Sequence, residues 1–490
     1  MPLVSTARNP APSLAGRSSE ERRLIAALKR LSERFKGDAE FRRGLIAGEI
    51  GAGTLVARYG ITIDPRELLP LYHPDFTGLA PEEWGGRWPL ASLWFEHAKT
   101  LRSYADTHRE LGRCARENPA FDAWRQRQIR RCNNELGASG SGLSHPILAF
   151  ELSAGCTMGC WFCGISAEQF RGNFRYTAEN AQLWQEMLAA SVALFGPAAQ
   201  QGFCYWGTDP CDNPDYADFI EDFLRATGTL PQTTTAAPLK NIVLTRRILA
   251  LQDAYGSVPD RFSILNLKTL DRVHATFTAD ELLNVELVLQ NPESDTPRTF
   301  AGRARERTPA IRAESESRRR VADATIACVS GFLVNMVDRT LRLVTPVPAS
   351  ERWPQGYRTY ETRPFTSAAD FRTGIEDLIA RHMPSAPRPD HRLRFRADLA
   401  YRPGDDGFEL VSRGARFTFT GSREKRRLGE LIHAGAHTAG GARAALIEGG
   451  CDLFVAANLV QQLFDRGLLE ETVVLDSVAA MPPRAEQPAA

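Results

Sequence analysis

The fold of this 490-residue chain is predicted chiefly from one stretch of its sequence, Ile147-Leu-Ala-Phe-Glu-Leu-Ser-Ala-Gly-Cys-Thr-Met-Gly-Cys-Trp-Phe-Cys163. Its first six residues form a short apolar run, which is typical of a buried strand. The run leads directly into a loop that carries three cysteines. From this point the sequence alternates between strand-like and helix-like segments, a pattern that favours a parallel sheet with outer helices.

The three cysteines of that loop are Cys156, Cys160 and Cys163, spaced C-x3-C-x2-C. Cysteine thiolates are the usual ligands of iron–sulfur clusters. Three of them hold three irons of a [4Fe–4S] cluster and leave the fourth iron open to a small molecule. A zinc site is the alternative, but it favours paired C-x2-C units, and no second pair follows at zinc-finger spacing.

The triplet resembles the signature of the radical S-adenosylmethionine (SAM) enzymes. The resemblance implies that the open iron binds SAM, whose cleavage gives a 5′-deoxyadenosyl radical. It also implies that Phe162, the aromatic residue before the third cysteine, lies beside the adenine. The fold that it implies is a partial (βα)6 barrel open on one side.

The composition is that of a globular protein, with 43% hydrophobic and 24% charged residues and a formal net charge of +1. The near-zero charge argues against a nucleic-acid partner, and the short apolar runs argue against a membrane span. The N-terminus lacks the pattern of a signal peptide, and nine cysteines do not form a disulfide framework at this length. We expect a cytoplasmic protein.

The chain divides into five parts. Residues 1–18 are rich in Pro, Ser, Ala and Arg, residues 479–490 are rich in Pro and Ala, and both segments predict disordered tails. Residues 19–140 show helical periodicity without strand alternation, and residues 141–385 carry the strand–helix alternation. Chemistry in such barrels sits at the C-terminal ends of the strands, where the cysteine loop falls.

Residues 386–478 have a different pattern. Leu393, Phe395 and Ala397 alternate with polar residues, as do two later segments around Phe408 and Phe417, so we expect three short antiparallel strands followed by three helices. The order resembles the winged-helix-like element with which peptide-modifying enzymes grip a leader peptide by β-augmentation. A DNA-binding winged helix is the alternative, although the last helix has a single basic residue, at its end.

A second motif follows the second strand, Trp206-Gly-Thr-Asp-Pro210. It lies where radical SAM enzymes carry a Gly-Gly-Glu-Pro-like segment that binds the SAM amino group. Gly207 permits a close backbone approach and Asp209 offers an acceptor, while Thr208 departs from the family pattern and Pro210 retains it. A plain Asx turn is the alternative. Ser263 and Asn266, on the fourth predicted strand, are further candidates for SAM contacts.

The whole arrangement is similar to peptide amino-acid epimerases of the polytheonamide type. That resemblance implies a cysteine outside the cluster that returns hydrogen to a flattened Cα radical. Cys328, on a predicted strand over 325–330, is our candidate, with Cys211 as the second choice. The other cysteines outside the triplet are Cys114, Cys132, Cys204 and Cys451.

The sequence therefore predicts a radical SAM enzyme that converts L residues of a ribosomally made precursor peptide to D residues. It would need a flavodoxin- or ferredoxin-type electron donor. Two alternatives stay open: another radical SAM modification of a peptide, such as a cross-link or oxidation, and an iron–sulfur redox-sensing DNA-binding regulator.

Overall fold

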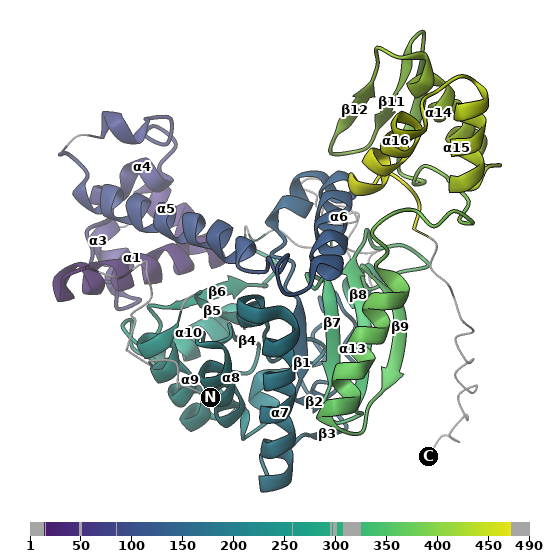
Figure 1. Ribbon diagram of the computed structural model, residues 1–490. Helices are drawn as coiled ribbons and strands as arrows, with labels where there is room; N and C mark the ends of the chain where they lie inside the picture. Colours follow the sequence, from purple (N-terminus) through teal and green to yellow (C-terminus); the bar gives the residue numbers. More distant parts are fainter. Residues whose placement is uncertain are drawn as a thin grey trace, which may run out of the picture.

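The fold is described from a computed structural model, shown in Figure 1. Both predicted tails fall largely outside the described residues. The exceptions are Leu14, Gly16, Arg17 and Ser18, of which Leu14 is buried and Ser18 caps the first helix. The structure describes residues 14, 16–48, 51–84, 86–256, 258–294, 296, 301–306 and 325–471.

The N-terminal region is helical, as predicted. Ser18 begins the first helix with a capping box, because its side chain accepts from the Glu21 backbone while the Glu21 carboxylate accepts from Ser18. Leu28 and Leu31, one turn apart, pack against Phe41 of the next helix. The helices of this region are α1 (Ser19–Gly37), α2 (Ala39–Ala47), α3 (Ala52–Ala57), α4 (Leu69–Tyr72), α5 (Pro89–Glu110) and α6 (Pro119–Leu136).

A parallel sheet and a mixed sheet make up the central α/β region. The parallel sheet has the order β4-β5-β6, and the mixed sheet has the order β1-β7-β8-β9. A parallel bridge joins Ala149 of β1 to Phe203, in the segment predicted as the second strand. In Figure 1, β1 lies between β4–β6 and β7–β9. The strands are β1 (Leu148–Glu151), β4 (Thr234–Thr235), β5 (Asp260–Ile264), β6 (Val285–Leu289), β7 (Gly331–Asn335), β8 (Thr340–Pro346) and β9 (Tyr357–Pro364).

The helices of this region cover one face of β1. Leu148 and Phe150 point toward α7 and α13 and belong to the main core, whereas Ala149 packs on the other face. Glu151 follows the alternation and therefore shares the inner face with Ala149. The helices are α7 (Ala178–Phe195), α8 (Tyr216–Thr227), α9 (Ile242–Tyr255), α10 (Leu267–Thr276), α11 (Gly302–Glu306) and α13 (Ala368–His382).

The prediction of a strand over Thr325–Ser330 is wrong. These residues form no strand, because β7 pairs in parallel with β1 and occupies the neighbouring position. The segment instead crosses the inner face, where Ala327 and Val329 pack against Ala149. The residues that follow form a hairpin, in which β7 and β8 pair antiparallel from Asn335 opposite Thr340.

The C-terminal domain, residues 393–469, has its own core and contains the three strands and three helices that were expected. The first strand was misplaced: it lies at β10 (Ala400–Gly404), while the 393–397 segment forms only an isolated bridge from Phe395 to Leu469. The other elements are β11 (Gly407–Val411), β12 (Arg416–Phe419), α14 (Arg423–Ala434), α15 (Ala439–Glu448) and α16 (Leu453–Asp465).

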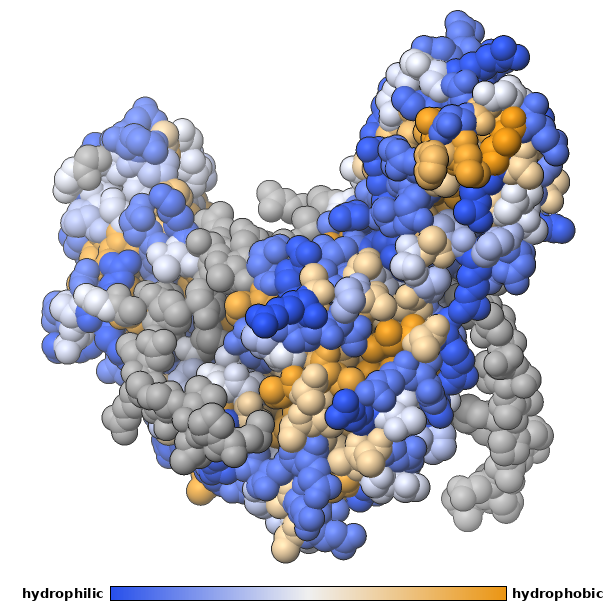
Figure 2. All heavy atoms as spheres, viewed as in Figure 1, coloured by the Kyte–Doolittle hydropathy of each residue, from blue (hydrophilic) through white to orange (hydrophobic). Residues whose placement is uncertain are grey.

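The C-terminal domain carries an exposed apolar patch. Leu453, Phe454 and Val455, at the start of α16, are exposed apolar residues, and Figure 2 shows a hydrophobic patch on the domain. Over the described residues, no helix has the length and apolar character needed to cross a membrane.

Candidate functional site

The cysteine loop leaves the C-terminal end of β1 and is closed at its base by a short antiparallel pair, β2 (Ser153–Ala154) and β3 (Gly172–Asn173). Gly155 has a φ of +72°, and a Cβ there would lie 2.2 Å from the Gln169 carbonyl oxygen. Only glycine allows the backbone at position 155 to come this close to the Gln169 carbonyl. The turn therefore aims Cys156 into the loop, and all three cysteines of the triplet are half-buried.

Backbone N–H groups point at two of the three sulfurs. Met158 donates to Cys156 Sγ over 3.4 Å, and Ala167 donates to Cys163 Sγ over 3.3 Å. Such bonds stabilise thiolates and tune iron–sulfur clusters. Without a metal, burial raises the pKa of Cys156 to about 12 and of Cys160 to about 11.

Among the described residues, no three His, Cys, Asp or Glu side chains gather as ligands of one metal ion. Each cysteine of a [4Fe–4S] cube binds a different iron, so its three sulfurs need not converge on a point. Three cysteines, two of which accept backbone N–H bonds at sulfur, are by their chemistry a donor set that such a cluster could use.

Asp212 fixes the start of the loop. Its Oδ2 accepts from the Thr157 N–H at 2.9 Å, and its Oδ1 accepts from the Thr157 hydroxyl at 2.6 Å. Lys240, at the foot of α9, donates to the same Oδ1 over 2.5 Å. The Asp212 carboxylate is fully buried, and the Lys240 ammonium balances its charge. This ion pair lies beside Thr157, the residue after Cys156.

Arg303 of α11 fixes the end of the loop. Its guanidinium donates to the carbonyl oxygens of Cys160, over 3.2 Å, and Ala167. Its backbone N–H donates to the Cys163 carbonyl over 3.0 Å. The preceding Gly302 has a φ of +53°, and a Cβ there would lie 2.6 Å from the same Cys163 oxygen. The chain around residue 302 thus lies directly on the cysteine loop.

The Gly207 turn lies beside the end of β1. Gly207 N–H donates to Glu151 Oε1 over 2.8 Å, while Glu151 Oε2 accepts from Asn335 and Arg342. The Thr208 hydroxyl is buried and has no hydrogen-bond partner within the described chain. A buried hydroxyl without a partner is costly unless a ligand satisfies it.

Asp209 points away from this inner face. Its Oδ1 accepts from the Thr235 hydroxyl at 2.6 Å and the Cys211 N–H at 2.9 Å, and its Oδ2 accepts from the Ala236 N–H at 2.7 Å. Burial raises its pKa. In this geometry Asp209 ties the turn to β4, and Pro210 begins the short 3-10 turn that follows.

The remaining SAM-contact candidates lie at separate places. Ser263 is half-buried on β5, on the face opposite the buried Phe262 and Ile264. Asn266 is not on the strand: it caps α10, and its Oδ1 accepts from the Thr269 N–H at 2.8 Å. Phe162 is half-buried in the cysteine loop, edge-on to the neighbouring Trp161 ring.

Cys328 differs from the other cysteines outside the triplet in its exposure. It is half-buried, whereas its five counterparts are buried: Cys114, Cys132, Cys204, Cys211 and Cys451. Burial among its neighbours raises the pKa of Cys328 to about 12, so it is a thiol at neutral pH. A protonated sulfur carries the hydrogen that a donor must give.

The Cys328 segment touches the cysteine loop. Exposure alternates along it, with Ile326 48% exposed, Ala327 buried and Cys328 half-buried, so Ile326 and Cys328 face the same open side. The Ile326 side chain would lie 2.7 Å from a Cβ on Gly164, the residue after Cys163. Two residues of chain span about 7 Å at most, so the backbone of Cys328 lies within that distance of Ile326, whose side chain contacts the loop.

Sequence reasoning missed Glu151, Asp212, Arg303 and Arg342. Glu151 carried a usable signal, since it is a lone carboxylate at the end of an apolar strand that precedes the cysteines. The other three are brought to the loop or to Glu151 by tertiary contacts over 50 to 190 residues, for which a single sequence holds no local sign.

Comparison with known proteins identifies a relative that matches most of the chain. The chain is 44% identical over 467 residues to "Uncharacterized protein y4wI" of Sinorhizobium fredii (strain NBRC 101917 / NGR234), covering 93% of this chain and 89% of that protein. A family model described as the protein y4wI C-terminal domain matches residues 393–467. No solved structure matches the chain significantly. The chain belongs to the y4wI protein family.

Proposed function

We propose that this protein is a radical SAM peptide epimerase that converts L residues of a ribosomally made precursor peptide to D residues. The observation that carries the proposal is the cysteine loop at the end of β1 with Cys328 close by. An abstracting site and a returning thiol on opposite sides of one Cα are what epimerisation requires.

The proposal assigns a task to each group. Cys156, Cys160 and Cys163 would hold a [4Fe–4S] cluster, and Gly207 and Thr208 would line the SAM site. When bound, the cluster and SAM would supply the radical chemistry that removes the Cα hydrogen from one face of the substrate. The Cys328 thiol gives its hydrogen to the other face. The sulfur is left one electron and one proton short, which a flavodoxin- or ferredoxin-type donor and solvent restore.

The strand arrangement supports a partial barrel around this site. The parallel pairs β4-β5-β6, the parallel bridge from β1 to Phe203 and the helices on the outer face follow the expected (βα) order. None of the sheets in the described part of the chain closes on itself. The nine free cysteines fit a reducing compartment such as the cytoplasm.

We propose that the C-terminal domain binds the leader of the precursor. The β12 strand is an edge of its sheet, and an edge offers unpaired N–H and C=O groups to an extended peptide. Arg466, after α16, lies over the Phe419 ring of β12, with its guanidinium carbon 5.3 Å from the centroid. The border between β12 and α16 is therefore the expected groove.

Mass spectrometry of a precursor peptide treated anaerobically in D2O tests the function. An epimerase with an exchangeable thiol adds about one mass unit per modified residue, and hydrolysis then yields D-amino acids. A loss of about two units without deuterium gain identifies the cross-linking or oxidising alternative. Wild-type protein that binds no iron and cleaves no SAM would reject the radical SAM assignment itself.

A further inference from the structure

Arg127 of α6 is a buried cation without a counter-ion. It is 3% exposed, and within the described chain no carboxylate oxygen lies within 4.0 Å of its guanidinium. Its Nη2 donates to the Pro384 carbonyl over 3.0 Å, and its guanidinium carbon lies 4.1 Å from the centre of the Phe464 ring. Its Nε is buried and bonded to nothing in the described residues.

Two other buried arginines near Arg127 form ion pairs with carboxylates. Arg131, one turn further along α6, forms an ion pair with Glu135. Arg396 pairs with Asp398 and, more loosely, with Glu135. Buried charges in proteins are normally paired in this way, because an uncompensated one is expensive. Burial accordingly lowers the pKa of Arg127.

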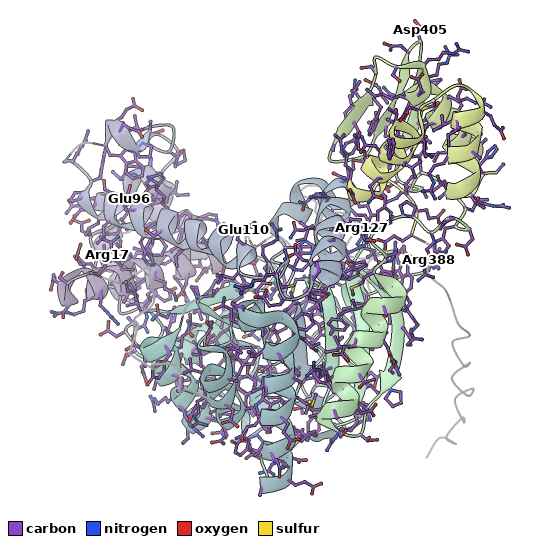
Figure 3. All side chains as sticks on the ribbon, in the orientation of Figure 1. Arg17, Glu96, Glu110, Arg127, Arg388 and Asp405 are labelled. Atoms are coloured by element: carbon purple, nitrogen blue, oxygen red, sulfur yellow. The ribbon has the colours of Figure 1, made fainter. Side chains whose placement is uncertain are left out.

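The unpaired guanidinium lines a small cavity between α6 and the C-terminal domain. The cavity measures about 70 Å³, which is room for a few water molecules or one small oxyanion. Arg388, His391 and Arg392 line it from the segment that leads into the domain. Neither Arg388 nor Arg392 has a carboxylate within 4.0 Å among the described residues. Figure 3 labels Arg127 and Arg388 at this junction.

Two carboxylates, Glu470 and Glu471, also border the cavity and could offset its positive charge. Glu471 accepts at Oε1 from the Gln128 amide and at Oε2 from the Tyr360 hydroxyl, and Arg358 lies 3.7 Å from Oε2. Glu471 bonds to these groups and not to Arg127, although its charge still acts on Arg127 from a distance. Glu470 is exposed to solvent. Four arginines line the cavity, and Arg381 is paired with Glu361, so Arg127, Arg388 and Arg392 remain to make the cavity cationic.

We propose that this cavity is a binding site for a small oxyanion, a phosphate or carboxylate group, held by Arg127, Arg388 and Arg392. The guanidinium fork matches both anions geometrically. The anion would come either from free phosphate or from an acidic side chain of a peptide on the C-terminal domain. In both cases it would link α6 to the segment entering that domain. The site does not depend on the radical SAM assignment.

Calorimetric titration of the full-length protein tests the site, with inorganic phosphate in one arm and N-acetylglutamate in the other. Ionic strength is held constant with chloride. Thermal unfolding is followed in parallel, because a ligand that binds only the folded state raises the melting temperature. The variants are Arg127→Met, Arg392→Gln, whose side chain is exposed, and the control Arg443→Gln on α15, outside the cavity.

We expect saturable binding to wild type and Arg443→Gln, and affinity at least about tenfold weaker in Arg392→Gln and Arg127→Met. Binding of phosphate alone identifies a free oxyanion as the ligand, and binding of N-acetylglutamate alone identifies an acidic peptide side chain. Absence of binding in both arms overturns the proposal, as does binding that Arg392→Gln leaves unchanged. Because Arg392 is exposed, this last comparison stands even where Arg127→Met fails to fold.

Discussion

Asp212 holds Thr157 with both carboxylate oxygens, one on the backbone N–H and one on the hydroxyl, immediately after the first cysteine of the triplet. The two residues are 55 positions apart, so the geometry of the cysteine loop depends on the turn after the second strand segment. The loop is therefore held by the α/β region as well as by its own backbone bonds.

Replacing Asp212 by Asn should loosen the loop. The amide keeps one acceptor, loses the charge that Lys240 needs, and costs about 2–4 kcal/mol of folding free energy. Thr157→Val, which removes only the hydroxyl, should cost about 1 kcal/mol. Iron and sulfide per chain after anaerobic reconstitution should fall in the same order. Asp253→Asn, at an exposed ion pair, is the control; equal iron in all three variants would contradict the anchoring role.

Arg303 should tune the proposed cluster as well as hold it. A cation beside the Cys160 and Cys163 carbonyls favours the more negative, reduced cluster, so Arg303→Gln should lower the midpoint potential by on the order of tens of millivolts. Arg303→Lys should restore most of the potential because it keeps the charge.

A redox titration followed by electron paramagnetic resonance measures that shift. Arg305→Gln, on the same short helix, is the control and should leave the potential unchanged. A potential that moves equally in Arg303→Gln and Arg303→Lys would show that hydrogen-bond geometry matters and charge does not.

Local signals in the sequence located most of the helices and several strands. A threonine at the cap position and an apolar face at helical spacing mark α7 in the sequence, and an apolar run of five residues marks β6. These elements follow from short-range preferences, capping and periodicity.

Strand pairing was harder to predict from the sequence, because each strand pairs with a segment far away along the chain. The 325–330 segment has strand-like residues, but β7 takes the place beside β1. In the same way, the 393–397 alternation matched a strand that β10 supplies instead. Propensity for a strand describes fit to a half-buried surface and does not select the neighbour.

In the candidate site, too, local features could be predicted and features that depend on distant contacts could not. The cysteine triplet and its place after β1 could be predicted, since both are adjacent in sequence. The side chains that orient the loop and the turn could not, and Asp209 shows why: a carboxylate in a promising motif was turned into β4 by Thr235 and Ala236. Side-chain direction depends on packing partners that the motif does not contain.

Cys328→Ala should separate the two halves of the proposed reaction. SAM cleavage should persist, because the cysteine triplet is untouched, while formation of D residues should fall at least about a hundredfold for lack of a hydrogen donor. Chiral analysis of hydrolysed product alongside 5′-deoxyadenosine release measures both. Cys204→Ala, at a fully buried thiol, is the matched control; full epimerisation by Cys328→Ala would remove its assigned role.

Leader binding should depend on the free edge of β12. Successive N–H groups of a strand point to opposite sides, so one of Phe417→Pro and Thr418→Pro blocks the edge while the other disrupts pairing with β11. The variant that keeps its circular dichroism spectrum should bind leader at least about tenfold more weakly.

Phe454→Ser serves as the comparison, because Phe454 lies in the exposed apolar patch at the start of α16. Fluorescence anisotropy with a labelled leader should show it binding like wild type. Loss of binding in Phe454→Ser alone would move the peptide from the β12 edge to the apolar patch. Deletion of residues 390–490 should abolish binding in either case.

Asp260, at the start of β5, should make stability depend on pH. It is buried, Oδ1 accepts from Thr233, and Oδ2 has no partner in the described chain; burial raises its pKa well above the ordinary value. The folded state therefore binds more protons than the unfolded state between the two pKa values, and stability falls as pH rises through that window.

Asp260→Asn removes this titration while keeping an acceptor for Thr233. The difference in unfolding free energy, variant minus wild type, should increase with pH by up to about 1.4 kcal/mol per unit above the ordinary aspartate pKa, and level off above the raised one. Urea unfolding at a series of pH values measures it. Other titrating groups cancel in the difference, so a flat or falling curve would mean that Asp260 has an ordinary pKa in the folded protein.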